Sequence, residues 1–256
     1  MASRNLTLDG LRGCLAVLVL VSHVFAQCGS QALRAPSMVA VWIFFLISAY
    51  VLTQGCWDGR FVLFLVRRVV RLWPTYALCL AGGFCLLGAA PDPLEFVWLP
   101  LRNWPPTGDP PGWSLTIEAA AMLAMPLIAL VGRGGFARLV IAVAGSVIAM
   151  ELLTPHAFYA PFFFIGAWLT RFEFRWKPLE TPLPQWFGRI SYPLYVCHYP
   201  IIVFTGLPLW VSIPLAFAVA ELLTRTVEKW SIQASRRAGR FTVMGIRRNR
   251  ALLRAS

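Results

Sequence analysis

The chain has 256 residues, of which 58% are hydrophobic and only 13% are charged. Soluble domains carry about 25% charged residues, so this composition excludes an ordinary soluble protein and indicates a membrane protein. The formal net charge of +12 does not indicate nucleic-acid binding, because the basic residues lie between apolar runs and at the C-terminus, without a basic recognition helix.

The apolar segments are long enough to cross a membrane. A hydrocarbon core about 30 Å thick needs roughly 20 helical residues per crossing. We predict an all-α, polytopic transmembrane bundle of about eight helices. They lie near residues 8–27, 36–55, 73–90, 113–131, 136–153, 157–170, 190–206 and 207–224. The sixth is short, and only the turn signal Gly206-Leu207-Pro208 separates the last two.

The distribution of Lys and Arg tests this division independently, because these residues collect in cytoplasmic loops. Of the 23 Lys and Arg residues, only Arg34 and Arg102 fall on the outer side of the eight-helix scheme. We therefore predict that both termini are cytoplasmic. The predicted domains are a transmembrane domain over 1–230 and a basic tail over 231–256, which anionic lipid head groups would attract.

The first apolar segment has a second interpretation, a cleaved signal peptide. Arg4 precedes this segment, and Val24-Phe25-Ala26 ends it as a passable cleavage site. A histidine inside the core of a signal peptide is unusual, and removing the segment would leave the alternation of charges without its starting point. We therefore favour a retained helix.

The only long loop that the sequence predicts covers about residues 91–112 and is rich in Pro, Trp and Asp. The alternation of charges places this loop on the outer side, where it would cover an opening of the bundle. The fourth helix then enters from the outer side behind Trp113.

Ionisable residues inside the predicted helices are few, and their cost in a membrane makes each a candidate functional residue. Arg12 and His23 are eleven residues apart, which returns them to nearly one helix face at about 16 Å separation. Glu118 lies about five residues into the fourth helix, at a predicted depth similar to that of His23. A carboxylate can orient an imidazole that takes a proton from a hydroxyl. Equally, such a pair can simply join two helices.

Two further groups of residues suggest binding. His198 lies in the segment 190–200, whose prolines indicate a distorted helix that lines a pocket. Arg68 and Arg71 precede the third predicted helix at i, i+3 spacing, so they share a helical face on the cytoplasmic side. Two guanidinium groups in this arrangement can bind a phosphate-rich ligand, although ordinary positive-inside anchoring explains them as well.

The six cysteines form no Cys-x-x-Cys pair and no spacing typical of His/Cys metal ligands. Most of them lie in apolar stretches, where we expect them to pack as small hydrophobic side chains. We predict no metal site.

In chain order, these residues resemble the acyltransferase-3 family of membrane O-acyltransferases. Leu8-Asp9-Gly10-Leu11-Arg12 together with His23 is similar to the family's Arg-x10-His signature, and Arg68 with Arg71 to its Arg-x-x-Arg loop. The other similar segments are 41–48, 113–118 (Trp-Ser-Leu-Thr-Ile-Glu), 191–200 and 227–229. Two features depart from the family pattern: Ser48-Ala49-Tyr50 replaces Ser-Gly-Phe, and eight predicted crossings replace about ten.

The resemblance implies that this chain is a multi-pass protein of the bacterial inner membrane and that it transfers an acyl group, most often acetyl. The donor would be cytoplasmic acyl-CoA, and the acceptor a hydroxyl of a cell-surface or exported carbohydrate or glycolipid. No tightly bound cofactor is implied.

The resemblance also assigns roles to residues. His23 is the expected general base, with Glu118 as its orienting partner; the second, less favoured role for His23 is that of a covalent acyl carrier. Arg12, Arg68 and Arg71 are expected to bind the donor. The expected substrate cavity contains Asp9, Trp113, Ser114, Tyr192 and His198.

The sequence is also compatible with two other classes of function. A transporter or flippase also needs buried ionisable residues, yet the chain has no duplicated halves of the kind many carriers have. A non-catalytic partner in polysaccharide assembly would need the fold but would tolerate loss of His23. Hydrolysis or exchange of acyl-CoA by the purified protein would separate an enzyme from both.

Overall fold

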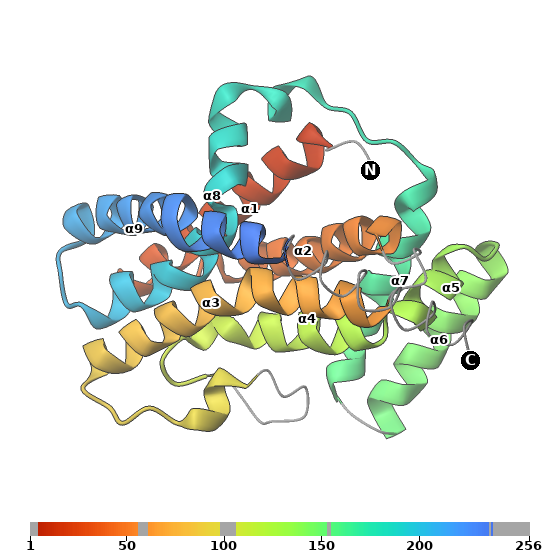
Figure 1. Ribbon diagram of the computed structural model, residues 1–256, viewed down its shortest axis with the longest axis horizontal. Coiled ribbons are helices and arrows are strands. Elements are labelled where there is room, and N and C mark those ends of the chain that lie inside the picture. The colour runs from red at the N-terminus through yellow and green to blue at the C-terminus, as the bar shows by residue number, and fades with distance from the viewer. Residues whose placement is uncertain (1–4, 56–60, 98–105, 153–154, 236, 238–256) are drawn as a thin grey trace, which may run out of the picture.

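The computed structural model describes residues 5–55, 61–97, 106–152, 155–235 and 237. Across these residues the chain is helical and has no strand, as predicted. Figure 1 shows the helices packed side by side in one bundle. The α-helices are α1 (Leu6–Gln27), α2 (Arg34–Gly55), α3 (Phe61–Leu87), α4 (Trp113–Leu123), α5 (Met125–Gly132), α6 (Phe136–Leu152), α7 (Ala160–Trp168), α8 (Pro182–Tyr199) and α9 (Leu209–Leu223).

Four helices in the described part of the chain are long and apolar enough to cross a membrane: Leu6–Gln27, Arg34–Gln54, Phe61–Leu87 and Leu209–Ser235. The segments Pro110–Leu123 and Met125–Gly132 together form a fifth candidate, bent by 73°. The all-helical fold is confirmed, and these candidate spans are consistent with the predicted membrane bundle. The number of eight crossings and the cytoplasmic position of both termini stay predictions.

The third helix begins earlier than the sequence predicted. It starts at Phe61 rather than near residue 73, so Arg67, Arg68 and Arg71 lie within α3 and not in a loop before it. Val66, Val69, Val70 and Leu72 flank these arginines, and the long arginine side chains can keep their charges in polar surroundings while the stem packs on apolar residues. The arginines therefore sit at fixed positions on a helix.

The last part of the chain is one hairpin of two interrupted helices. α8 ends in a π-helical turn at Pro200–Phe204, where proline cannot supply a backbone N–H. Gly206 then adopts a left-handed conformation (φ 65°), which confirms the predicted turn. α9 continues through a π-helical turn, Thr224–Glu228, so that the helical span reaches Ser235. The predicted domain boundary at residue 230 thus falls within a helix, and residues 236 and 238–256 of the predicted tail lie outside the described residues.

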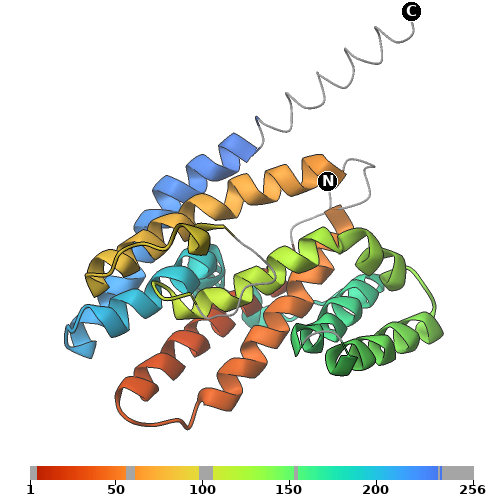
Figure 2. The ribbon, with the colours of Figure 1, turned by 90° about the horizontal axis from the view of Figure 1, so that it is seen from below.

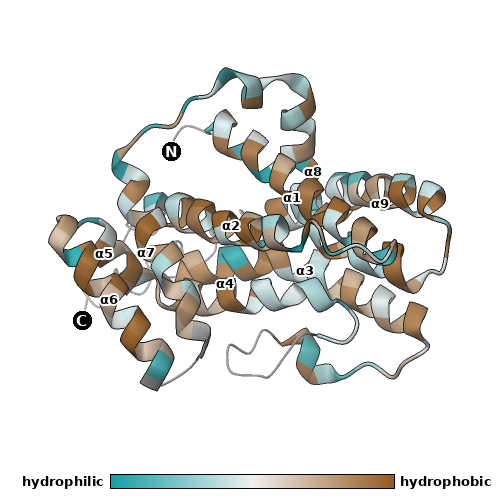
Figure 3. Ribbon diagram, turned by 180° about the vertical axis from the view of Figure 1, so that it is seen from behind, coloured by the Kyte–Doolittle hydropathy of each residue, from teal (hydrophilic) through white to brown (hydrophobic). Residues whose placement is uncertain are grey.

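Large apolar side chains cover much of the surface. Ile141 is 72% exposed, Val62 69% and Trp210 78%, and each lies on a different helix. Figure 3 shows hydrophobic colours along the helices and more hydrophilic residues in the segment between α7 and α8. Such a surface needs lipid as its solvent, which agrees with the candidate membrane spans.

Close contact between α1 and α8 depends on glycine. A side chain at Gly13 would collide with Phe187 and with the backbone of Gly188, and one at Gly188 would collide with the Asp9 carbonyl. Small residues let two membrane helices approach until their backbones touch. This contact holds the Arg12 and His23 helix directly against α8.

The segment after α3 folds back alongside that helix (Figures 1 and 2). The Tyr76 hydroxyl donates to the Glu95 carbonyl (3.0 Å), and the Thr107 N–H donates to the Glu95 carboxylate (2.9 Å). Farther along, the Gly108 carbonyl rests on Gly83. The described part of the predicted loop is thus packed against α3, and α4 starts beside Tyr76, at the middle of α3.

Adjacent glycines in α3 provide a test of this packing. Gly83→Ala places a methyl group against the Gly108 carbonyl, whereas nothing lies within 4 Å of a Cβ at Gly82. We expect Gly83→Ala to destabilise the protein by about 1–3 kcal/mol through overpacking. The matched Gly82→Ala variant should be neutral or gain up to about 1 kcal/mol of helix stability. Thermal unfolding of both variants in detergent checks this, and equal melting temperatures would contradict the packing of Gly108 on α3.

Candidate active site

Two histidines from distant parts of the chain lie in direct contact. Nε2 of His198, on α8, is 3.0 Å from Nδ1 of His23, on α1. His198 is fully buried, whereas His23 is partly exposed near the end of its helix. The ring of Tyr199 packs edge-on against His23 with a centroid distance of 5.0 Å. The close packing of α1 on α8 places these rings together.

The hydrogen bonds of this pair determine which ring nitrogens carry hydrogen. Nδ1 of His198 lies 3.0 Å from the Leu194 carbonyl and 2.9 Å from the Tyr195 carbonyl. Carbonyl oxygens only accept, so we assign the hydrogen of neutral His198 to Nδ1 and a lone pair to Nε2. His23 must then donate from its own Nδ1. The Nε2 atom of His23 keeps a lone pair that can accept a proton.

Glu118 is bound to a cation and not to His23. Arg68 Nη2 donates to Glu118 Oε1 at 2.6 Å, and the Ser48 hydroxyl donates to the same oxygen at 2.7 Å. The side chains of Arg68 and Glu118 are 15% and 18% exposed. This charge-assisted pair connects α3 with α4, and Ser48 adds α2 to the connection.

The position of Glu118 differs from the expectation that it shares the depth of His23 and orients its imidazole. The difference follows from the segment that folds back along α3. Because α4 begins beside Tyr76, its second turn reaches the level of Arg68. Arg12 lies at this same level, since Arg68 and Glu118 are among the charges that act on it. His23 is about 16 Å farther along α1, a distance given by the helical rise.

A small cavity of about 50 Å³ lies between these helices. Its polar lining consists of Arg12, Ser48, Ser114, Glu118, Ser191, Tyr192 and Tyr195. Val41, Phe44, Phe45 and Leu115 supply the apolar part. Three sequence-predicted cavity or donor residues therefore meet here with Glu118: Arg12, Ser114 and Tyr192. The Tyr192 hydroxyl is fixed by donating to the Leu72 carbonyl at 2.7 Å.

Tyr195 separates this cavity from the histidine pair. Its hydroxyl is 2.8 Å from the Ser114 hydroxyl, and both groups lie close to the Pro111 carbonyl. On its other side, the Tyr195 ring has its centroid 6.0 Å from that of His198. The charged cavity and the two imidazoles are therefore neighbours along one path, with a single aromatic side chain between them.

The remaining predicted residues lie around this path. Asp9 stands one turn before Arg12 on α1, outside the cavity lining. Trp113 packs on Tyr159, with a distance of 5.4 Å between the ring centroids, and it also lies outside the cavity lining. Arg71 is 3.9 Å from Glu228, and its side chain is 44% exposed. Arg71 is thus more accessible to a soluble ligand than Arg68.

Sequence reasoning assigned no role to Ser48 or Tyr195, although both stand within segments that resemble the family. Tyr195 lies three residues before His198 and three after Tyr192, so one stripe of α8 carries all three side chains. This spacing could have indicated from the sequence that Tyr195 belongs to the site. No group of three or more potential metal ligands was found in the described parts of the chain.

Comparison with known proteins identifies the family to which this chain is similar. A family model described as an acyltransferase domain matches residues 5–183, more than half of the chain. The match includes Arg12, His23, Arg68 and Glu118, and it ends before the segment that contains His198. No curated protein and no solved structure matches the chain significantly.

Proposed function

Because this chain belongs to the acyltransferase-3 family, we propose that it transfers an acyl group, most often acetyl, from cytoplasmic acyl-CoA to a carbohydrate hydroxyl. The acceptor is part of a cell-surface or exported carbohydrate or a glycolipid, and the membrane is the bacterial inner membrane. The observation that carries this proposal is the arrangement along α1 and α8: cations at one end and an oriented, proton-accepting imidazole at the other.

This arrangement suits acyl-CoA. The phosphates of CoA are separated from the acyl thioester by the long, flexible pantetheine arm, so the two ends of the donor need two distant sites. Arg12 and the accessible Arg71 hold the anionic end. Arg68 was also expected to bind phosphate, but its Nη2 already donates to Glu118 Oε1. We assign Arg68 and Glu118 to positioning the cavity rather than to gripping the donor.

His23 acts as the general base. Its Nε2 takes the proton of the acceptor hydroxyl while the hydroxyl oxygen attacks the thioester carbonyl carbon. The carbon–sulfur bond then breaks, and the CoA thiolate receives the proton back from the imidazolium. During this cycle the Nδ1–H of His23 keeps donating to His198. The ester and free CoA are the products, and no other reactant is consumed.

Radiolabelled acetyl-CoA provides the test. Membranes with the wild type should label cell-envelope carbohydrate, and His23→Ala should lower the initial rate by about 10²–10⁴-fold, the usual contribution of a general base. Phe25→Ala is the matched control, because Phe25 lies half a turn further on α1 and is 42% exposed. Expression is equalised by immunoblot.

Equal labelling by the His23→Ala variant would overturn this mechanism. Labelling by neither protein, with hydrolysis or exchange of acyl-CoA also absent, would favour a transporter or a non-catalytic assembly partner.

A further inference from the structure

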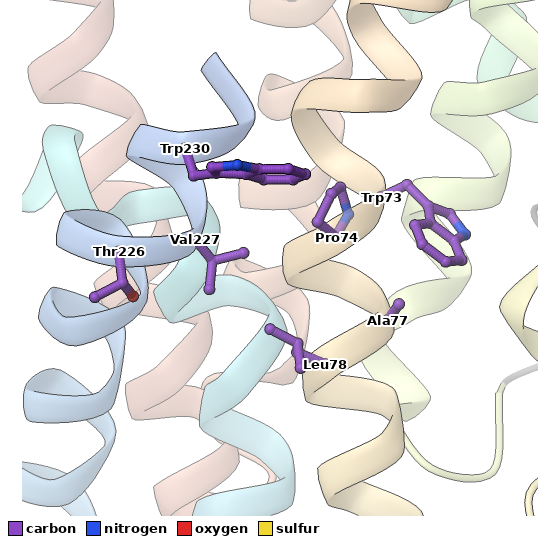
Figure 4. A pocket seen from close by; sticks show the side chains of 7 residues that line it. All are labelled: Trp73, Pro74, Ala77, Leu78, Thr226, Val227 and Trp230. Carbon is purple, nitrogen blue, oxygen red and sulfur yellow. The ribbon is translucent and has the colours of Figure 1, made fainter. Parts of the chain in front are cut away.

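A second concavity lies away from the candidate active site, between α3 and the helix Leu209–Ser235. Its volume is about 550 Å³. The lining residues are Trp73, Pro74, Ala77 and Leu78 on one wall and Thr226, Val227 and Trp230 on the other. We call it the α3–α9 groove. Figure 4 shows the Trp230 ring reaching toward Pro74, with Val227 and Leu78 facing each other beneath it.

The groove is chemically apolar. Six of its seven side chains are hydrophobic, and the seventh, Thr226, already donates its hydroxyl hydrogen to the Leu222 carbonyl at 2.6 Å. Carbon atoms therefore make up nearly all of the surface that a bound group meets. Leu78 is 52% exposed and Trp230 60%, so the groove opens outward from the bundle. Both walls are candidate membrane spans, and the groove consequently faces lipid.

One end of the groove is basic on both walls. Arg67, Pro74 and Leu78 are separated by seven and four residues, which places them on one stripe of α3. Trp230 and Arg237 are separated by seven residues along the facing helix. Arg67 and Arg237 are both exposed.

The two walls are joined at this basic end. The Ser235 hydroxyl donates to the Arg67 carbonyl at 2.9 Å, which brings Arg67 and Arg237 to the same level of the bilayer. Arg71 lies on the same stripe of α3, where Glu228 partly offsets its charge. Arginines in such numbers mark the cytoplasmic boundary of a membrane span. The apolar part of the groove extends from this boundary into the inner leaflet.

We infer that the α3–α9 groove binds one anionic phospholipid of the cytoplasmic leaflet. One acyl chain lies against Leu78, Val227 and Trp230, and the phosphate lies between Arg67 and Arg237. The charge at the end of the groove complements an anionic head group, and the carbon lining complements the chain. The residues that hold the lipid differ from those assigned to acyl transfer: none of them lines the cavity or contacts the histidine pair, and Arg71 is left to the acyl donor.

Native mass spectrometry of the full-length purified protein tests the inference. The protein is mixed with equal amounts of phosphatidylglycerol and phosphatidylcholine of the same chain lengths. The wild type should retain one phosphatidylglycerol after detergent is removed. Leu78→Trp fills the groove and should lose this lipid. Leu222→Trp adds the same side chain at a position that is 60% exposed and outside the groove, and it should keep the lipid.

The arginines are tested separately from the groove. Arg67→Gln combined with Arg237→Gln should weaken phosphatidylglycerol binding roughly 25-fold, the effect of two basic residues that each contribute about 1 kcal/mol near anionic lipid. Binding of phosphatidylcholine should stay the same. Equal retention of the two lipids by the wild type, or unchanged lipid in Leu78→Trp, would overturn the inference. A dimer that only Leu78→Trp dissociates would also overturn it, by identifying a second copy as the occupant.

Discussion

Replacing His198 by asparagine should lower the rate of acyl transfer by about 10²-fold or more, whereas replacing it by glutamine should keep the rate within about tenfold of the wild type. The two amides differ by one methylene. The asparagine amide lies near the position of His198 Nδ1, where it can donate to the Leu194 or Tyr195 carbonyl, but it does not reach His23. The glutamine amide extends to the position of Nε2, where its oxygen can accept from His23 Nδ1.

The expected difference follows from the hydrogen of His23. Without Nε2 of His198 as an acceptor, the ring of His23 is held less firmly, and its Nε2 presents a lone pair to the acceptor hydroxyl less often. The imidazolium formed during transfer also loses one hydrogen-bond acceptor, the Nε2 atom of His198. His198 is therefore a positioning residue for His23. This role rests on the proposed function.

Initial rates at varied acetyl-CoA concentration measure this prediction in purified protein. Both variants should keep the wild-type KM for acetyl-CoA, because Arg12, which binds the donor, lies about 16 Å from His23 along α1. The thermal unfolding temperature of each variant is the control for folding. Equal losses of kcat in the asparagine and glutamine variants would show that His198 only fills space, even if His23→Ala is inactive and the proposed function holds.

The periodicity of the sequence predicted the arrangement along α1 well. Arg12 and His23 return to one face after eleven residues, and both side chains face α8, Arg12 across the cavity and His23 through the bond to His198. Helical geometry alone determines this relation, so no knowledge of the neighbouring helices was needed.

The depth of Glu118 was not predictable in the same way. The sequence places Glu118 five residues after Trp113, and a helix that enters from the outer surface would bring it to His23. Its actual level depends on the contacts of Tyr76 with Glu95 and of Gly83 with Gly108, which carry the start of α4 inward. Such contacts between distant segments leave no periodic pattern. The same applies to His198, because nothing in its local sequence indicates that His23 is its partner.

The second large effect concerns Arg12. Arg12→Gln should raise the KM for acetyl-CoA by about 10–150-fold, the loss expected when a hydrogen bond to a charged group worth about 1.5–3 kcal/mol is removed. Arg12 lines the cavity, whereas Arg68 is paired with Glu118. The kcat at saturating donor should change much less, because His23 and His198 lie beyond Tyr195.

Arg225→Gln is the matched control for this prediction. Arg225 also lies near the end of a membrane span, but its side chain is 72% exposed and pairs with Glu221 at 2.7 Å, away from the cavity. Its removal should leave the KM for acetyl-CoA unchanged. Whether replacing Arg12 raises the KM also distinguishes two roles for this residue, donor binding and charge balance. If Arg12 only balanced the charge of Glu118, its loss would lower the amount of folded protein without raising KM, and donor binding would have to be assigned to Arg71 alone.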